Sequence, residues 1–358
     1  MDADFIIIGG GIAGVSAAAR LSQLGSVLLV ECEDSLAYHA SGRSAALYEP
    51  HYGAAPVVGL SLASRDYFFA QKDVLSPRGL LMVAKADEME VLRADAFEMN
   101  LELISADEAC AMVPVLNPAV VAGGATADHA WDIDTDLLLQ GFARAARAKG
   151  ARILTQARVS GIQRCKGEWV VTTSAGVFSS GLLVNAAGAW VDVVARMAGV
   201  QPLGFQPNRR SMARIAAPGA HDVRRWPMLF GVGETWYAKP DAGALLVSPA
   251  EEHPMPPHDA FADDMVLAEG LARYEAMVTE PVTRLITSWA GLRTFAPDRV
   301  LVIGRDVREP AFFWLAGQGG YGFQSSPAAS QLVADLIAGQ APQIEDGLVK
   351  ALSPDRFE

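Results

Sequence analysis

The chain has 358 residues, with 29 Lys and Arg against 41 Asp and Glu, so its formal net charge is −12 and its pI is near 5.0. This length exceeds the usual size of one domain and predicts two. Hydrophobic residues make up 51% of the chain and charged residues 20%, which excludes a disordered protein. The acidic balance argues against nucleic acid or an anionic membrane as a partner, because both require a basic surface.

Three cysteines, Cys32, Cys110 and Cys165, are spaced too widely for a disulfide framework or a zinc site. We therefore expect a reducing, cytoplasmic location and no metal. No apolar run approaches the ~20 residues of a membrane-spanning helix, so none is predicted. Asp2 and Asp4 stand where a secretory signal would carry basic residues, so we expect no such signal.

The N-terminal residues carry the most specific pattern in the chain. Residues 5–8 are a β-branched run that predicts a buried parallel strand, and residues 9–14 follow with the pattern G-x-G-x-x-G. Residues 13–24 predict a helix, and residues 26–30 predict a second strand with Glu31 at its end. This order of elements is typical of a dinucleotide-binding βαβ unit.

The glycines of this pattern have separate physical roles. Gly9 permits a tight turn, Gly11 lets the backbone approach a pyrophosphate, and Gly14 lets the helix pack closely on the strand. The helix N-terminus offers unpaired N–H groups to phosphates, and a carboxylate at Glu31 bonds the ribose hydroxyls. The same carboxylate would repel a 2′-phosphate, which argues against NADP. A glycine-rich turn without a ligand is the alternative.

Residues 39–46 give the first distinction between FAD and NAD. Small residues surround Arg43 there, and Ser41, Arg43 and Ser44 could donate hydrogen bonds along the pyrophosphate and ribityl chain of FAD. An ordinary connecting loop with a solvated arginine is the alternative.

Two later segments also favour FAD. Residues 182–190 and 312–322 each read as a strand that runs into small residues and could approach a dinucleotide. A helix beginning near Ser325 would direct its positive end at a reduced flavin. A plain strand–turn–helix is the alternative for the second segment.

Two shorter patterns predict local structure. Asp132 and Asp134 predict a turn and an N-cap before a helix at 137–149, rather than a metal site. Residues 240–243, Pro-Asp-Ala-Gly, predict the turn of a hairpin.

Several motifs come in the order found in the D-amino acid oxidase-like FAD oxidoreductases, which this chain resembles along nearly its whole length. Within that family its motifs resemble those of bacterial D-arginine dehydrogenase. Besides the N-terminal pattern, the motifs are HASGRSAA (39–46), LVNAAGAW (183–190), NRRS (208–211), YAKPDAG (237–243), SWAGLRTF (288–295) and GQGGYG (317–322).

The resemblance implies an α/β (α+β) fold with two domains and non-covalent FAD. A discontinuous, Rossmann-like domain made of residues 1–75, 130–205 and 290–358 would bind FAD. Residues 76–129 and 206–289 would form a second domain, a mixed sheet that binds substrate. No cysteine stands where some relatives attach their flavin covalently.

The resemblance also assigns the cofactor-binding positions, most of them outside the N-terminal pattern. They are Gly9, Gly11, Ile12, Ala13, Gly14, Glu31, Ser41, Arg43, Ser44, Ala45, Val159, Ala187, Gly188, Trp190, Gly291, Gly319, Tyr321, Gly322 and Gln324.

Five residues would contact the substrate, according to the same resemblance. Arg210, Arg293 and Tyr237 would hold a carboxylate. The carbonyl of Gly320 would accept from the amino group, and Tyr52 would lie on a mobile, lid-like loop. Chemistry alone leaves alternatives open: Arg293 could pair with a structural carboxylate, Arg210 could belong to a solvated basic face, and Tyr237 could serve packing in a strand.

The substrate pocket is where the chain departs from D-arginine dehydrogenase. Leu80 stands where that enzyme has a glutamate for the guanidinium, Leu47 replaces a histidine, and Glu49 replaces a threonine. Loss of a buried carboxylate weakens the binding of a cation, although Glu49 could restore the charge from another wall. We favour a neutral or apolar substrate side chain over a basic one.

The implied reaction is oxidative deamination of a D-amino acid to a 2-oxo acid and ammonia, by hydride transfer to flavin N5. The electron acceptor, oxygen or quinone-like, is left open, and no side chain is an evident base. One alternative is oxidation of glycine, a sarcosine-type N-alkyl amino acid or a 2-hydroxy acid. An alternative from another class is a non-catalytic dinucleotide-binding subunit or redox sensor, which would need no carboxylate anchors.

Overall fold

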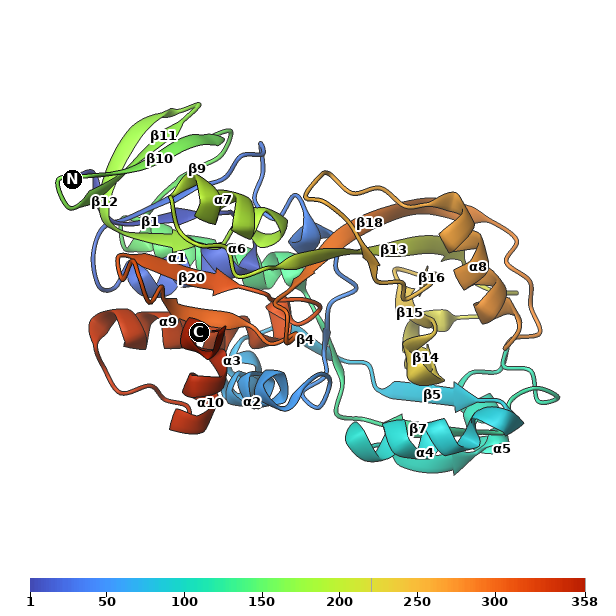
Figure 1. The fold of residues 1–358 in the computed structure, drawn as a ribbon. Coiled ribbons are helices and arrows are strands. Elements are labelled where there is room, and N and C mark those ends of the chain that lie inside the picture. The colour runs from blue at the N-terminus through green and yellow to red at the C-terminus, as the bar shows by residue number, and fades with distance from the viewer. Residues whose placement is uncertain (220, 358) are drawn as a thin grey trace.

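The computed structural model describes residues 1–219 and 221–357. Its strands form two large sheets and one small sheet between them. In Figure 1 the first sheet and its helices lie on the left, and the second sheet with its helices lies on the right. The chain passes from one to the other several times, so each sheet is built from separated stretches of sequence.

The first sheet has eight strands among the described residues and a parallel centre, in which β1 lies between β12 and β2. All four residues of β2 are buried, as expected for a parallel strand covered on both faces. β20 pairs with the C-terminal end of β12. The strands are β1 (Ala3–Ile8), β2 (Val27–Val30), β9 (Arg152–Leu154), β10 (Val159–Cys165), β11 (Glu168–Thr173), β12 (Gly176–Asn185), β19 (Val302–Arg305) and β20 (Phe312–Ala316).

Helices cover both faces of the first sheet. Ile7 and Leu29 pack with α1 (Ile12–Leu21), α6 (Thr135–Ala148) and α9 (Gly322–Ala338). The alternate residues of the same strands face the opposite way and pack against α7 (Val191–Met197). The core that holds α1 also includes residues of α2 (Ala55–Ala63), α3 (Arg65–Ala70) and α10 (Asp346–Leu352). Every helix of the described residues is too short or too polar to cross a membrane.

The second sheet has nine strands among the described residues and mixes parallel and antiparallel pairs. Its helices are α4 (Met89–Glu98), α5 (Ala106–Met112) and α8 (Asp264–Glu275). The strands are β5 (Leu80–Ala84), β6 (Glu102–Ser105), β7 (Gly123–Ala127), β13 (Gln206–Ala216), β14 (Met228–Gly231), β15 (Tyr237–Asp241), β16 (Ala244–Ser248), β17 (His253–Pro254) and β18 (Leu285–Phe295).

These two sheets confirm the predicted fold class, a Rossmann-like sheet joined to a second, mixed sheet. β15 and β16 are antiparallel neighbours, so the predicted hairpin is confirmed. The predicted domain boundary at residue 290 falls inside β18, which pairs with β13 over nearly its whole length. The predicted helix at 13–24 begins at Ile12 and ends at Leu21.

The small sheet, made of β3 (Leu47–Tyr48), β4 (Leu75–Pro77) and β8 (Trp131–Ile133), lies between the large ones. The side chain of Asp134 accepts a hydrogen bond from the N–H of Leu137 at 2.8 Å, which confirms the predicted N-cap of α6. The predicted turn role of Asp132 is wrong. Asp132 lies within β8, and its carboxylate binds the guanidinium of Arg78.

Candidate functional site

The N-terminal glycines make a turn that no larger residue could form. Gly9 has φ of +113°, and a Cβ on it would lie 2.3 Å from the carbonyl oxygen of Ala186. A Cβ on Gly14 would lie 2.0 Å from the carbonyl oxygen of Gly9. Both positions therefore require glycine, because nothing larger fits between α1, β1 and the end of β12.

Glu31 is buried at the end of β2, as the pattern predicts. Its Oε2 accepts from the N–H of Gly10 at 2.5 Å, and its Oε1 accepts from the N–H of Glu33 at 2.9 Å. These bonds fix the carboxylate beside the glycine turn. A carboxylate oxygen has more than one lone pair, so both oxygens can still accept from ribose hydroxyls.

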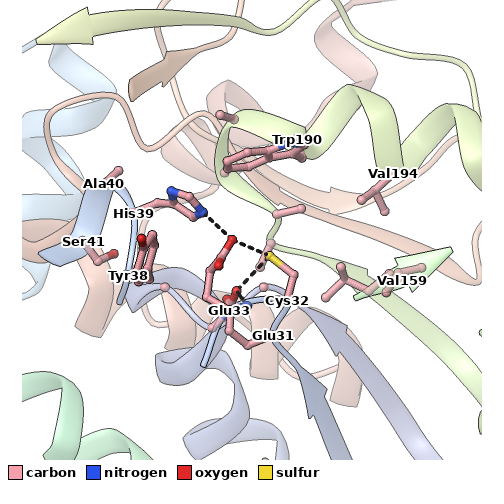
Figure 2. Close-up of a pocket in the computed structure, with 18 of the residues that line it drawn as sticks. Glu31, Cys32, Glu33, Tyr38, His39, Ala40, Ser41, Val159, Trp190 and Val194 are labelled. Atoms are coloured by element: carbon pink, nitrogen blue, oxygen red, sulfur yellow. Dashed lines mark hydrogen bonds and ion pairs between the residues drawn. The ribbon is translucent and has the colours of Figure 1, made fainter. Parts of the chain in front are cut away.

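A large cavity, here called the nucleotide cavity, opens around Glu31 (Figure 2). Trp190, Val194 and Val159 line an apolar part of this cavity, which suits an adenine ring. The predicted cofactor positions that line this cavity are Gly9, Gly11, Glu31, Ser41, Arg43, Val159, Ala187, Gly188 and Trp190.

Cys32, Glu33 and His39 bring possible metal-ligating atoms within 4.8 Å of one another in the same cavity. Figure 2 shows them joined by hydrogen bonds: His39 Nε2 lies 3.0 Å from Glu33 Oε1, and the Cys32 thiol also contacts Glu33. Burial and the neighbouring charge of Glu31 raise the pKa of Cys32 to about 12, so the sulfur keeps its proton. These hydrogen bonds make the three side chains part of the wall of the nucleotide cavity.

Ser41 and Arg43 hold protein groups in place. The N–H of Ile12, at the start of α1, donates to Ser41 Oγ at 3.0 Å. The guanidinium of Arg43 donates to the carbonyls of Ala260 and Ala290 at 2.8 and 2.9 Å and to Asp259 at 2.5 Å. Arg43 therefore links three segments beside the nucleotide cavity, and its contact with FAD stays a prediction.

A second space, the central cavity, continues from the nucleotide cavity and shares Gly11, Ser41 and Arg43 with it. Two residues that line it, Thr294 and Gln318, each have a buried polar atom, Oγ1 and Nε2, without a hydrogen-bond partner among the described residues. Unsatisfied buried polar atoms are costly and indicate a ligand. The other predicted positions lining this cavity are Ile12, Ala13, Ser44, Ala45, Gly291, Gly319 and Gly322. An apolar nucleotide pocket, a glycine turn and unpaired donors in one continuous space fit FAD.

Arg210 and Arg293 lie on one face of the β13–β18 pair. Arg210 is opposite Gly291 and Arg293 is opposite Asn208, so the two arginines are diagonal neighbours. Arg210 is only 7% exposed, so the alternative of a solvated basic face is wrong; its Nη2 lies 3.2 Å from Glu252 Oε1. No carboxylate of the described residues lies within 4.0 Å of Arg293. Arg293 is the cation left for an external anion.

A third space, the inner cavity, lies beside the arginines. Arg210, Tyr237, Arg293 and Gly320 line both it and the central cavity, so the predicted substrate contacts converge where the two spaces meet. A Cβ on Gly320 would lie 3.0 Å from Arg293 Nη1, which places the loop after β20 directly against the guanidinium. The predicted cofactor residue Gln324 also lines the inner cavity, and its Nε2 is unpaired.

Tyr52 separates the inner cavity from a more open one, here called the outer cavity. Its hydroxyl donates to Glu234 Oε2 at 2.9 Å, and its ring lies 5.3 Å from the ring of Tyr321. Burial raises the pKa of Tyr52, which keeps the hydroxyl protonated as a donor. Tyr321 was expected to contact the cofactor, but it lines the outer cavity beside Tyr52.

The predicted pocket residues divide into two groups. Leu47 and Glu49 line the inner cavity, whereas Leu80 is 1% exposed in a core cluster with Met228 and Tyr237. The carboxylate of Glu49 is buried; its Oε1 accepts from the N–H of His51 at 2.9 Å and lies 3.1 Å from His129 Nε2. Its Oε2 has no partner among the described residues. Leu80 therefore does not shape this cavity, and Glu49 does.

Sequence reasoning missed several residues of these cavities. Thr294 and Gln318 stood inside quoted motifs next to predicted residues, so their position was the available signal. Glu234 lies three residues before Tyr237, and its partner Tyr52 is distant in sequence. Nothing in the local sequence of His129 marked it as the partner of Glu49, because only the fold joins them.

Comparison with known proteins gives a consistent result. The profile of the family described as FAD dependent oxidoreductase (DAO) matches residues 4–336. The sarcosine oxidase subunit beta of Rhizobium meliloti (strain 1021) is 25% identical over 99% of this chain and 88% of its own. The glycine oxidase of Pseudomonas putida is 26% identical over 96% and 97%. The crystal structure of glycine oxidase from Geobacillus kaustophilus covers 98% of each chain with a TM-score of 0.83 and 22% identity, which supports the fold.

Proposed function

The chain belongs to the FAD dependent oxidoreductase (DAO) family, and from that premise we propose that it oxidises the Cα–N bond of an amino acid or N-alkyl amino acid. The observation that carries the proposal is the Arg293 guanidinium, which lines the inner cavity with no carboxylate within 4.0 Å among the described residues. A half-buried cation without a partner favours an anionic ligand. An amino acid substrate would supply such an anion, its carboxylate.

The residues around Arg293 can orient such a substrate. Arg293 offers a planar fork that matches a carboxylate, and the Tyr237 hydroxyl can donate to the same group. The carbonyl of Gly320, beside Arg293, can accept from the amino group. Arg210 is already paired with Glu252, so its part is to add positive potential and a second donor. Holding the Cα in one orientation supplies much of the rate of such a reaction.

FAD, held non-covalently in the nucleotide and central cavities, would supply the two-electron acceptor for the Cα hydride. Glu31 and the N-terminus of α1 would hold its ribose and phosphates. Gln318 and Thr294 would use their unpaired atoms on its other end. Tyr52 and Glu234 would exclude water from the substrate on the side of the outer cavity.

The named relatives support a glycine- or sarcosine-type substrate better than a D-amino acid with a large side chain. The inner cavity favours a second candidate, a D-amino acid. Leu47, Met99 and Phe230 line a space beyond the arginines that glycine would leave empty. The unpaired Oε2 of Glu49 in the same wall suits a polar or cationic side chain. The original preference for an apolar side chain relied on Leu80, which lies outside this cavity.

The test is to purify the protein, record its visible spectrum and mix it anaerobically with glycine, sarcosine, and D- and L-amino acids. We expect a yellow protein whose ~450 nm band is bleached by at least one of them, because the electrons removed from the substrate reduce the flavin. Bleaching by glycine or sarcosine alone supports the first candidate, and faster bleaching by a longer D-amino acid supports the second. A yellow protein bleached by none of them contradicts the proposal.

A further inference from the structure

A buried charged cluster joins the second sheet to the part of the chain that surrounds the central cavity. Lys239 Nζ lies 2.8 Å from Asp132 Oδ1, and the other oxygen of Asp132 accepts from Arg78 Nε at 2.8 Å. The side chains are only 10%, 17% and 12% exposed. Lys239 lies on β15 of the second sheet, whereas Asp132 lies on β8 of the small sheet.

The ammonium of Lys239 has two further partners, the carbonyl oxygens of Ala45 and Ala46, at 2.5 and 3.2 Å. The ammonium thus donates two hydrogen bonds to the backbone and makes an ion pair with Asp132. Ala46 has φ of +47°, a conformation that is strained for a residue with a side chain and persists only where its surroundings enforce it. Lys239 is the charged group among its partners; Ser44 Oγ accepts from the N–H of Ala46, and the N–H of Ile133 donates to its carbonyl.

The backbone that Lys239 bonds belongs to a wall shared by two cavities. Ser44 and Ala45 line both the central cavity, where the flavin fits, and the inner cavity, where the substrate fits. Lys239 itself lines none of the four cavities described above. Its effect on either ligand would therefore pass through this backbone.

The same strand carries a substrate contact. Tyr237 is two residues before Lys239 on β15, so both side chains leave the same face of the strand. Tyr237 lines the inner cavity, while Lys239 donates to the backbone of the wall between the two cavities. One strand thus carries both a candidate contact for the substrate carboxylate and the side chain that bonds the wall facing the flavin.

Stability is a weak explanation for this cluster, because a buried ion pair often contributes no more than well-packed apolar residues would. We propose that Lys239 is a positioning residue, whose ammonium fixes the Ala45–Ala46 backbone and so aligns the substrate anchors of the second sheet with FAD. This inference rests on the proposed amino acid oxidation for its kinetic consequence, but its structural consequence can be measured without substrate.

The main test compares Lys239→Met with Arg214→Met. Arg214 makes a comparable ion pair with Asp241, 2.7 Å at the other end of β15, but both partners belong to the second sheet. In the FAD-loaded proteins we expect Lys239→Met to change the visible circular dichroism of the bound flavin and weaken FAD binding, whereas Arg214→Met leaves both as in the unsubstituted protein. With a reducing amino acid at saturation, Lys239→Met should bleach about 100-fold more slowly with little change in KM.

Lys239→Arg keeps a cation with several donors and should recover most of the flavin dichroism and rate, which a general loss of stability would not explain. If Lys239→Met fails to fold, Lys239→Gln gives the same test, because it removes the ammonium but keeps a polar side chain; it should alter the dichroism in the same direction. Dichroism, FAD affinity and rate that match those of Arg214→Met would overturn the inference. If no amino acid bleaches the unsubstituted protein, the proposed function fails, and the dichroism still decides the role of Lys239.

Discussion

The two ends of the ligand space are built in different ways. The nucleotide end is formed mainly by the backbone. Gly9 and Gly14 allow α1, β1 and the end of β12 to approach one another closely, and backbone N–H groups fix the carboxylate of Glu31. At the substrate end, side chains from distant strands converge, with Arg293 from β18, Tyr237 from β15 and Tyr52 from the loop before α2. The first end depends on residues close in sequence and tolerates no added atoms. The second depends on the fold, and a single residue there can be replaced without displacing the others.

The largest effect should come from adding atoms at the nucleotide end. In Gly14→Val the new Cβ would meet the Gly9 carbonyl at 2.0 Å, so the turn must move and FAD should be lost during purification. The absorbance ratio of flavin to protein measures this. Gly141→Val, on α6, is the matched control, because its nearest contact would be the flexible end of Arg144 at 3.9 Å. Equal flavin content in the two variants would contradict the expectation that the nucleotide end tolerates no added atoms.

At the substrate end, removing one charge should spare the cofactor. Arg293→Met should keep its FAD but lose about a hundred- to a thousandfold in kcat/KM, because the substrate carboxylate would enter a cavity without its partner. Steady-state kinetics and flavin absorbance on the same sample separate the two effects. Arg305→Met is the control and should keep full activity, because among the described residues its guanidinium bonds only the carbonyl of Pro310, at an exposed site. Activity within twofold of that control would show that Arg293 is not the anchor.

A smaller effect, on selectivity alone, should follow at Glu49. Glu49→Leu should reduce the preference for D-ornithine over D-norvaline by about tenfold, because these differ by one ammonium group and Oε2 is the buried acceptor without a partner. The ratio of the two kcat/KM values is the measurement. Glu98→Leu, at the rim of the outer cavity, controls for the general loss of negative charge. If both substrates lose equally, Glu49 contacts the part that they share.

The smallest effect concerns pH. The hydrogen bond to Glu49 raises the pKa of His129 above its usual 6.5, although burial opposes the shift. The folded protein therefore holds this proton more tightly than the unfolded chain does. The resulting stability is fully present below pH 6.5 and is lost as the pH rises through the raised pKa. Denaturation of His129→Gln across this range should lack that decline, and an identical pH profile would exclude the pair as its source.

The same contrast explains what could be predicted from sequence. The glycine pattern, Glu31 and the flanking strands are encoded within about thirty residues, and the structure has them as expected. The roles expected for Leu80 and Tyr321 follow from position in a motif, and that of Asp132 follows from its neighbours in sequence; neither says where a side chain points. Lys239 stood inside the quoted YAKPDAG motif without a role, because its partners are about 100 and 190 residues away in the chain. Contacts of that range follow from the assembled sheets rather than from local periodicity.

The links made by Arg43 bear on how the cofactor enters. Arg43 holds the carbonyl of Ala260 and the carboxylate of Asp259, and His258 and Ala260 both line the nucleotide cavity. They belong to the segment between β16 and α8, which is rich in proline and contributes no residue to the inner cavity. Substitutions in this segment should therefore change the rate of FAD release while leaving the contacts of the inner cavity in place.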